Sequence, residues 1–424
     1  MKMRRTLSLL LAMVMLFAVL TGCGDKTPHT PENPDTTVTP EVPETPATPD
    51  VPEVPETPVI PETPEVPETP EVPDTPEVPE TPEVPETPEV PGTELTPEAP
   101  PVTPPVDLPT EVTPVYRNPL TGVETSKDLS GQRPYAVMLN NLTVALPQHG
   151  NSQADVIYEV LAEGGITRMM ALYQDVSSIG NIGSIRSARH YYIELAQGHD
   201  AIYIHAGGSP QAYDLINAGA IASVDGTKGG LSNKVFWRDQ GRISSAGYEH
   251  SLFTSGKKLA ENVGTSASIR QTHYEGFTAP QKFVEDATPT QGMDAPLVRA
   301  YFTPSKKTSF QYDANTGLYG VYEYGSIYVD GNTGKQVNVT NVLCLRTDVS
   351  TIAGDTAGRQ NVRTTGEGSG YFACGGKAVE IKWSRASATD PFVYTLKDGT
   401  PLELEIGTSY ICILPKSGSI TFTE

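Results

Sequence analysis

Short apolar and β-branched runs alternate with polar segments over residues 118–280, and this pattern predicts a mixture of strands and helices. Runs rich in β-branched and aromatic residues favour strands, and they occupy residues 135–140, 156–160, 169–173 and 201–205. Three other runs open on a Ser or Thr that can cap the first backbone N–H groups of a helix. These predicted helices occupy residues 187–196, 209–217 and 254–263.

From residue 290 onward the pattern changes to one strand after another. The predicted strands occupy residues 298–303, 318–324, 337–346, 379–383 and 409–414. Turn sequences such as Asn315-Thr316-Gly317 and Asp398-Gly399 separate them. We therefore expect an α+β or α/β domain with a mixed sheet over residues 115–285, followed by an antiparallel all-β domain over residues 286–424.

The first apolar run of the chain directly follows three positively charged residues. Lys2, Arg4 and Arg5 precede residues 7–20, which are almost unbroken in their apolar character, and Leu20-Thr21-Gly22-Cys23 closes the run. This arrangement is typical of a secretory signal, and its last four residues are similar to the bacterial lipoprotein signal. We expect a signal peptide over residues 1–22 and a lipidated Cys23 at the outer face of the cell membrane. A membrane-spanning helix, the alternative, needs ~20 apolar residues, and this run has 14.

Residues 23–114 lack an apolar pattern and are dominated by proline. Residues 28–114 hold 28 of the 39 prolines, 21 acidic residues and no Lys or Arg, and every third residue from Pro40 to Pro91 is proline. A polyproline II helix has three residues per turn, so these prolines lie along one edge. At ~3.1 Å per residue the segment reaches at most roughly 270 Å. We expect a stiff spacer; a ligand for a proline-binding domain and a glycosylated Thr stalk are the alternatives.

The net charge of the chain comes from this linker. The chain has 30 basic and 51 acidic residues, which gives −21, and the linker alone carries −21, so the remaining residues sum to zero. Nucleic-acid-binding domains carry a basic surface, so we expect no nucleic-acid partner. Besides Cys23 there are Cys344, Cys374 and Cys412, and the sequence does not choose a pair among them. With no cluster of metal-ligand spacing and no nucleotide loop, we expect neither metal nor cofactor.

Residues 116–415 contain several distinctive motifs. They include Asn118-Pro119-Leu120-Thr121-Gly122, Glu163-Gly164-Gly165-Ile166-Thr167-Arg168, Ile185-Arg186-Ser187-Ala188-Arg189, His205-Ala206-Gly207-Gly208-Ser209-Pro210 and Phe236-Trp237-Arg238-Asp239. These motifs resemble those of the YerB-like lipoprotein family. The resemblance implies a secreted lipoprotein of Gram-positive-type bacteria with a two-domain body, and it implies no settled activity. The chain departs from the family around Ser409-Tyr410, where an aromatic residue is usual, and in its three later cysteines.

Two predicted helix starts carry the strongest candidate ligand site. Arg186 and Arg189 flank one start, where free N–H groups and the helix dipole favour an anion. The second start follows a glycine turn, which allows close approach of a ligand to the backbone. An internal brace, in which the arginines pair with Asp155, Glu159 or Glu163, is the alternative. The proposed ligand-binding residues are Arg186, Ser187, Arg189, His205, Gly207, Gly208 and Ser209.

Glu159 and His205 are the candidates for acid–base catalysis. Residues four apart on a strand lie ~13 Å apart, whereas the paired carboxylates of glycosidases lie roughly 5–9.5 Å apart. Asp155 and Glu159 therefore do not form such a pair, although Glu159 could act with a residue from elsewhere. His205 ends a predicted strand beside a glycine turn, where either a base or a structural histidine fits. No Gly-x-Ser-x-Gly motif supports a serine hydrolase.

These observations favour a cell-envelope lipoprotein without enzymatic activity. We expect it to bind an anionic wall glycan or polymer, or a wall-synthesis enzyme, while a lipid anchor holds it at the membrane. The alternative is a hydrolase or transferase that acts on cell-wall polymers.

Overall fold

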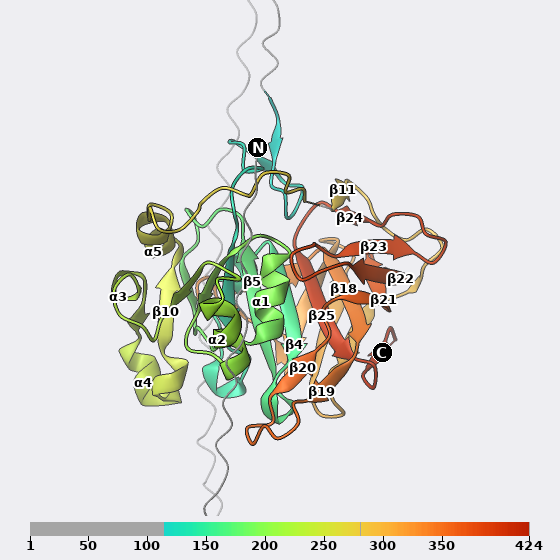
Figure 1. The fold of residues 1–424 in the computed structure, drawn as a ribbon. Helices are drawn as coiled ribbons and strands as arrows, with labels where there is room; N and C mark the ends of the chain where they lie inside the picture. Colours follow the sequence, from blue (N-terminus) through green and yellow to red (C-terminus); the bar gives the residue numbers. More distant parts are fainter. Residues whose placement is uncertain (1–113, 280, 424) are drawn as a thin grey trace, which may run out of the picture. The chain divides into compact units, whose positions relative to one another are not determined.

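The computed structural model describes residues 114–279 and 281–423 and places eleven of their strands in one large sheet (Figure 1). The predicted signal peptide, Cys23 and the proline-rich linker lie outside the described residues. In order across the sheet, its strands are β12 (Met293–Asp294), β22 (Lys377–Arg385), β21 (Gly366–Cys374), β18 (Asn341–Thr347), β25 (Ser409–Pro415), β4 (Val156–Leu161), β5 (Thr167–Tyr173), β3 (Tyr135–Leu139), β7 (Ile202–His205) and β8 (Ser223–Asp225), with β23 (Val393–Leu396) beside β22.

The sheet is mixed, and strands from both halves of the chain meet at its centre. β25 runs parallel to β4 on one side and to β18 on the other. β4, β5 and β3 follow one another in antiparallel pairs, whereas β3, β7 and β8 are parallel. The two halves of the chain therefore share one sheet, and the domain boundary at residues 285 and 286 stays a prediction.

Side-chain alternation gives this sheet two apolar faces. In β3, Ala136 and Met138 belong to one buried cluster, and Val137 and Leu139 belong to the other. Helices α1 (His190–Gln197) and α2 (Pro210–Asn217) cover the first face, as Figure 1 shows for the region of β4 and β5.

A second, antiparallel sheet packs on the other face. Phe310 on this sheet meets Tyr410 of β25 edge-on, with the ring centroids 4.9 Å apart. Its strands are β16 (Ser326–Ile327), β15 (Leu318–Glu323), β14 (Lys307–Asp313), β13 (Leu297–Tyr301) and β26 (Ser419–Thr421), with β17 (Asn338–Val339) beside β15.

A smaller unit of strands and short helices lies beside β3 and β7, at the left of Figure 1. It contains β6 (Asn181–Gly183), β10 (Leu252–Ser255), β9 (Trp237–Arg238), α3 (Ser232–Val235), α4 (Gln240–Ala246) and α5 (Gly256–Lys258), which continues as a π-helical turn over Leu259–Val263. The remaining pairs are β1 (Tyr116–Arg117) with β2 (Glu124–Thr125), β11 (Lys282–Val284) with β24 (Glu403–Glu405), and β19 (Val349–Thr351) with β20 (Gln360–Val362). Within the residues described, every helix is too short or too polar to cross a bilayer.

The predicted fold class is confirmed: an α/β region with a mixed sheet precedes a mostly antiparallel β region. The predicted start of the first helix is wrong by three residues, since α1 begins at His190. Ile185 and Ala188 are extended instead, because they bridge to Leu139 and Gly208. Residues 254–263 are also only partly helical, because Leu252–Ser255 pairs as β10 and Ser255, not Thr254, caps the helix that follows.

Candidate functional site

The two segments predicted to form a ligand site do lie side by side. Ala188 bridges Gly208 in parallel; its N–H donates to the Gly207 carbonyl at 2.9 Å, and its carbonyl accepts from Ser209 N–H at 3.1 Å. Because α1 and α2 begin just after these residues, the two helix starts are neighbours.

Both arginines predicted to hold an anion in this cluster already contact a carboxylate of the same chain. The buried Arg189 guanidinium donates to Glu163, with its Nε 3.2 Å from Oε2, and Arg168 contacts the same carboxylate. Arg186 donates to the Glu249 carbonyl at 2.9 Å and lies 3.3 Å from that carboxylate.

The backbone of the glycine turn also contacts a carboxylate of the same chain, that of Asp225. The Gly207 N–H donates to Oδ1 of Asp225 at 2.8 Å, and Thr227 donates to this oxygen through both its N–H and its hydroxyl. Tyr213 donates to the second oxygen at 2.7 Å. The internal brace that the sequence also allowed is present for Arg189 and Glu163. Arg186 pairs with Glu249 instead, and Asp225 takes the position of the anion at the glycine turn. Ser187 and Gly208 remain half-exposed beside it.

Ser209 and His205 have local structural partners. The Ser209 hydroxyl accepts from Ala212 N–H at 3.2 Å and caps α2 as predicted. His205 is fully buried, its Nδ1 lies 2.8 Å from the Gly207 carbonyl oxygen, and burial lowers its pKa. Among the described residues its Nε2 has no hydrogen-bond partner. A ligand-binding or catalytic role for these residues stays a prediction.

Glu159 lies at the centre of a buried polar cluster between the two sheets. Asn141 and Thr167 donate to its Oε1 at 3.1 and 2.5 Å, and Tyr410 donates to its Oε2 at 2.8 Å. The ammonium group of Lys306 is 3.2 Å from Oε1 and also contacts Glu323. Glu159, Lys306 and Glu323 expose 0%, 5% and 2% of their surface, so no substrate reaches them in this conformation.

Glu323 is the carboxyl group of this cluster whose pKa is raised toward neutral pH. The Thr308 hydroxyl oxygen lies 2.7 Å from Oε2 of Glu159 and 2.9 Å from Oε1 of Glu323. Its single hydrogen can be donated to only one of the two carboxylates. Burial, together with the nearby Glu159 charge, raises the pKa of Glu323 to about 7. Burial acts to lower the pKa of Lys306, but the two carboxylates outweigh it and the pKa is raised.

No local pattern in the sequence indicates the partners of Glu159. Lys306 stands just before β14 and Glu323 ends β15, and charged residues in such amphipathic strands normally face water. Only the packing of the second sheet on β4 turns them inward.

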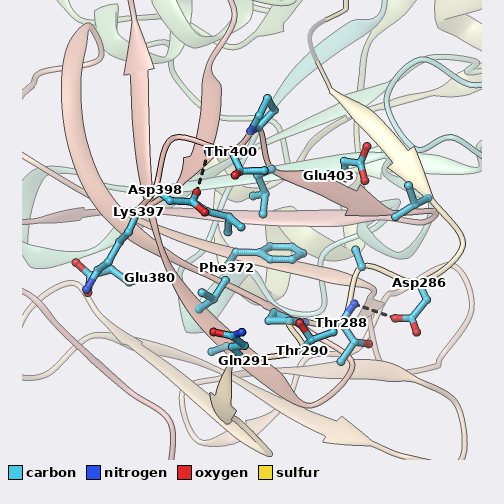
Figure 2. Close-up of a pocket in the computed structure, with 18 of the residues that line it drawn as sticks. Asp286, Thr288, Thr290, Gln291, Phe372, Glu380, Lys397, Asp398, Thr400 and Glu403 are labelled. Carbon is cyan, nitrogen blue, oxygen red and sulfur yellow. Dashed lines mark hydrogen bonds and ion pairs between the residues drawn. The ribbon is translucent and has the colours of Figure 1, made fainter.

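A groove in the C-terminal half offers a candidate binding site. Its volume is about 730 Å³, and it runs between residues 284–293 and residues 396–403. Figure 2 shows Phe372 in the middle, Glu380 and Lys397 at one end, and Asp286 and Glu403 at the other. Sequence analysis missed this site, because its polar residues come from segments that read as ordinary turns.

A group of cations in the N-terminal half has no carboxylate partner among the described residues. Lys258 donates to the Lys234 carbonyl at 3.0 Å, and its ammonium group lies 5.9 Å from the centre of the Trp237 ring. Arg238 stacks 3.6 Å above the Tyr248 ring, and Arg242 donates to the carbonyls of Ala145 and Pro147. We call Lys234, Trp237, Arg238, Arg242 and Lys258 the cationic surface.

The described residues contain no group of three His, Cys, Asp or Glu side chains placed to hold a metal ion. Cys344, Cys374 and Cys412 are buried free thiols; Cys344 and Cys412 stand opposite each other on β18 and β25.

The chain matches two family descriptions in succession. Residues 120–272 match "Protein of unknown function (DUF3048) N-terminal domain", and residues 298–411 match "Protein of unknown function (DUF3048) C-terminal domain". YerB of Bacillus subtilis (strain 168), whose name assigns it provisionally to the lipoproteins, is 31% identical over 304 residues, which are 70% of this chain and 86% of that protein. The crystal structure of the YerB protein from Bacillus subtilis has a TM-score of 0.60 at 30% identity and covers 72% of this chain and 99% of the solved one.

Proposed function

Because this chain belongs to the YerB-like family with paired DUF3048 domains, we propose that it is a lipid-anchored envelope protein that binds an anionic cell-wall polymer without catalysis. The name of its Bacillus relative is consistent with a membrane-anchored, extracytoplasmic location. Cys23 supplies the attachment point, and the linker of residues 28–114 supplies the distance between membrane and wall.

The observation that carries the proposal is the cationic surface. Most other arginines and lysines near it are neutralised by carboxylates, as Arg186 and Arg189 are. In the cationic surface, Arg238, Arg242 and Lys258 contact carbonyls and aromatic rings instead, and no ion pair to a carboxylate is formed by its cations within the described residues. An anionic polymer would supply the missing charge, and the half-exposed Trp237 ring offers a face on which a sugar can stack.

The test is a binding assay with the full-length chain in a neutral detergent. The probes are purified wall fragments and a soluble glycerol-phosphate polymer. Lys234→Glu/Lys258→Glu should weaken binding at least about tenfold, and salt should weaken binding of the parent chain because it screens exposed charges. The matched control reverses two exposed lysines elsewhere, Lys282→Glu/Lys335→Glu. Equal binding by both variants would refute the proposal.

The buried cluster supports a second candidate, a hydrolase or transferase of wall polymers. Glu323, with its pKa near 7 beside Glu159, has the proton affinity of a general acid or base. Catalysis would require Tyr324, which is exposed and lies over Lys306, to move aside. Release of product from wall polymers that falls ~10²–10⁴-fold in Glu323→Gln would support this candidate, and no release by the parent chain would exclude it for those polymers.

A further inference from the structure

Two of the three later cysteines stand directly opposite each other in the large sheet. β18 and β25 are parallel neighbours (Figure 1), and their register pairs Cys344 with Cys412. Neighbouring strands lie ~4.8 Å apart, and the Cα atoms of a disulfide usually lie roughly 4.4–6.8 Å apart. The backbone therefore holds these two residues at the separation that a disulfide bond requires.

The two side chains also lie on the same face of the sheet. Cys344 and Cys412 both belong to the buried cluster on the face that the second sheet covers, and they expose 1% and 0% of their surface. Burial, together with the Cys344 thiol beside it, raises the pKa of Cys412. The two thiols are therefore neighbours within one layer of the core.

The third of these cysteines is placed differently. Cys374 belongs to the other buried cluster, on the face that carries α1 and α2, and its thiol donates to the Glu405 carboxylate at 3.1 Å. It lies on β21, and the residue of β21 that stands opposite Cys344 is Tyr371. Because Cys374 is on the other face and out of register, the structure selects the pair that the sequence leaves open.

We propose that Cys344 and Cys412 form a disulfide bond in the exported protein. Each thiol loses its hydrogen as the bond between the two sulfur atoms forms. The two electrons and two protons pass to the disulfide of an extracytoplasmic thiol–disulfide oxidoreductase, which becomes a dithiol. Disulfides persist outside the cytoplasm, and the name of the Bacillus relative is consistent with that location. The inference rests on this location and not on polymer binding.

The oxidation takes place before β25 is fully packed. A thiolate is the attacking form in disulfide exchange, whereas in the folded protein both sulfur atoms are buried and the pKa of Cys412 is raised. Until β25 pairs with its neighbours, both thiols are accessible to the oxidant. The bond then ties β25 to β18 and so secures the strand that carries Tyr410 to Glu159.

The test is differential labelling of the full-length chain, exported by a bacterial host and purified in a neutral detergent. A first maleimide, present in denaturant from cell lysis onward, labels the free thiols. After reduction, a maleimide of different mass labels the thiols that reduction releases, and mass spectrometry of peptides reads each cysteine separately. Cys344 and Cys412 should carry the second label and Cys374 the first, whereas the first label on all of them would overturn the proposal.

Two matched variants identify the partner of Cys344. In Cys412→Ala, Cys344 should carry the first label, because its partner is gone. In Cys374→Ala, which removes the cysteine on the other face, Cys344 and Cys412 should keep the second label. A second label on Cys344 in the Cys412→Ala chain would overturn the pairing.

Urea unfolding tests what the bond does for β25. A reductant should lower the urea midpoint of the parent chain and of Cys374→Ala, because a disulfide restricts the unfolded chain. The same reductant should leave the midpoint of Cys344→Ala/Cys412→Ala unchanged. An equal effect of the reductant on the parent chain and on this double variant would overturn the stabilising role.

Discussion

Glu323 should make the protein less stable as the pH rises from 4.5 to 8. The folded protein holds the Glu323 proton up to pH about 7, whereas an ordinary glutamate releases it near 4.5. The folded state therefore binds more protons in this window, so the free energy of unfolding falls as the pH rises. The contribution is fully present below pH 4.5 and is lost as the pH rises through 7. One pKa unit corresponds to ~1.4 kcal/mol, so the loss is about 3 kcal/mol.

Glu323→Gln removes this titration and keeps a side chain of similar shape. Other groups titrate in the same window, so the useful quantity is the difference in unfolding free energy between the variant and the parent chain at each pH. This difference should shift in favour of the variant by about 3 kcal/mol between pH 4.5 and pH 8. Urea unfolding, followed by the fluorescence of Trp237 and Trp383, measures it. The exposed Glu367→Gln serves as the control and should show no such shift.

A difference in unfolding free energy between the variant and the parent chain that does not change with pH would refute the reasoning. It would mean that the Glu323 carboxylate is stabilised as well in the folded protein as in water, which requires a different arrangement of Lys306 and Thr308. A difference that moves against the variant as the pH rises would show that the folded protein lowers this pKa.

Two further predictions concern the anchor and the helix cap. Cys23→Ser should move the chain from the membrane fraction to the soluble fraction, because it removes the thiol that carries the lipid; unchanged fractionation on cell lysis would contradict the lipoprotein assignment. Ser209→Ala should lower the unfolding free energy by ~1 kcal/mol, because the Ala212 N–H loses its cap, whereas Ser244→Ala, on the exposed side of α4, should change it by less than ~0.5 kcal/mol in the same urea titration.

The central strands of the large sheet, such as β3 and β4, could be predicted because they are nearly continuous apolar runs, whereas β8, β12, β21 and β23 were not predicted. All five residues of β3 and all six of β4 are buried, so no alternation confuses the pattern. The start of α1 could not be predicted in the same way. Ser187 is a good cap by residue type, but the backbone of residues 185–188 is held extended by its neighbours in the sheet. Tertiary pairing there outweighs local preference.

The candidate site was predictable only in part. The contact of Ala188 with Gly208 was expected in outline, because both residues lie in motifs predicted to open helices at one site. Glu163 was among the partners expected for the arginines, and it pairs with Arg189. Glu249 and Asp225 were not expected, since both lie in other segments and no pattern links them to Arg186 or to the glycine turn. The groove was missed for a related reason: Asp286 and Asp398 look like turn residues because they are turn residues, and their shared acidic field arises only when the two turns face one cavity.

The position of β25 sets the order in which the protein can be completed. This strand is synthesised long after β4, yet it fills the gap between β18 and β4 and brings Tyr410 to Glu159. Until β25 pairs with β4, one edge of β4 has no neighbouring strand, and the Glu159 carboxylate lacks the hydroxyl donor of Tyr410. The earlier part of the chain therefore exposes an incomplete sheet that is prone to aggregate. Splitting the gene between the two DUF3048 regions would therefore yield fragments that aggregate when expressed apart and recover solubility when expressed together.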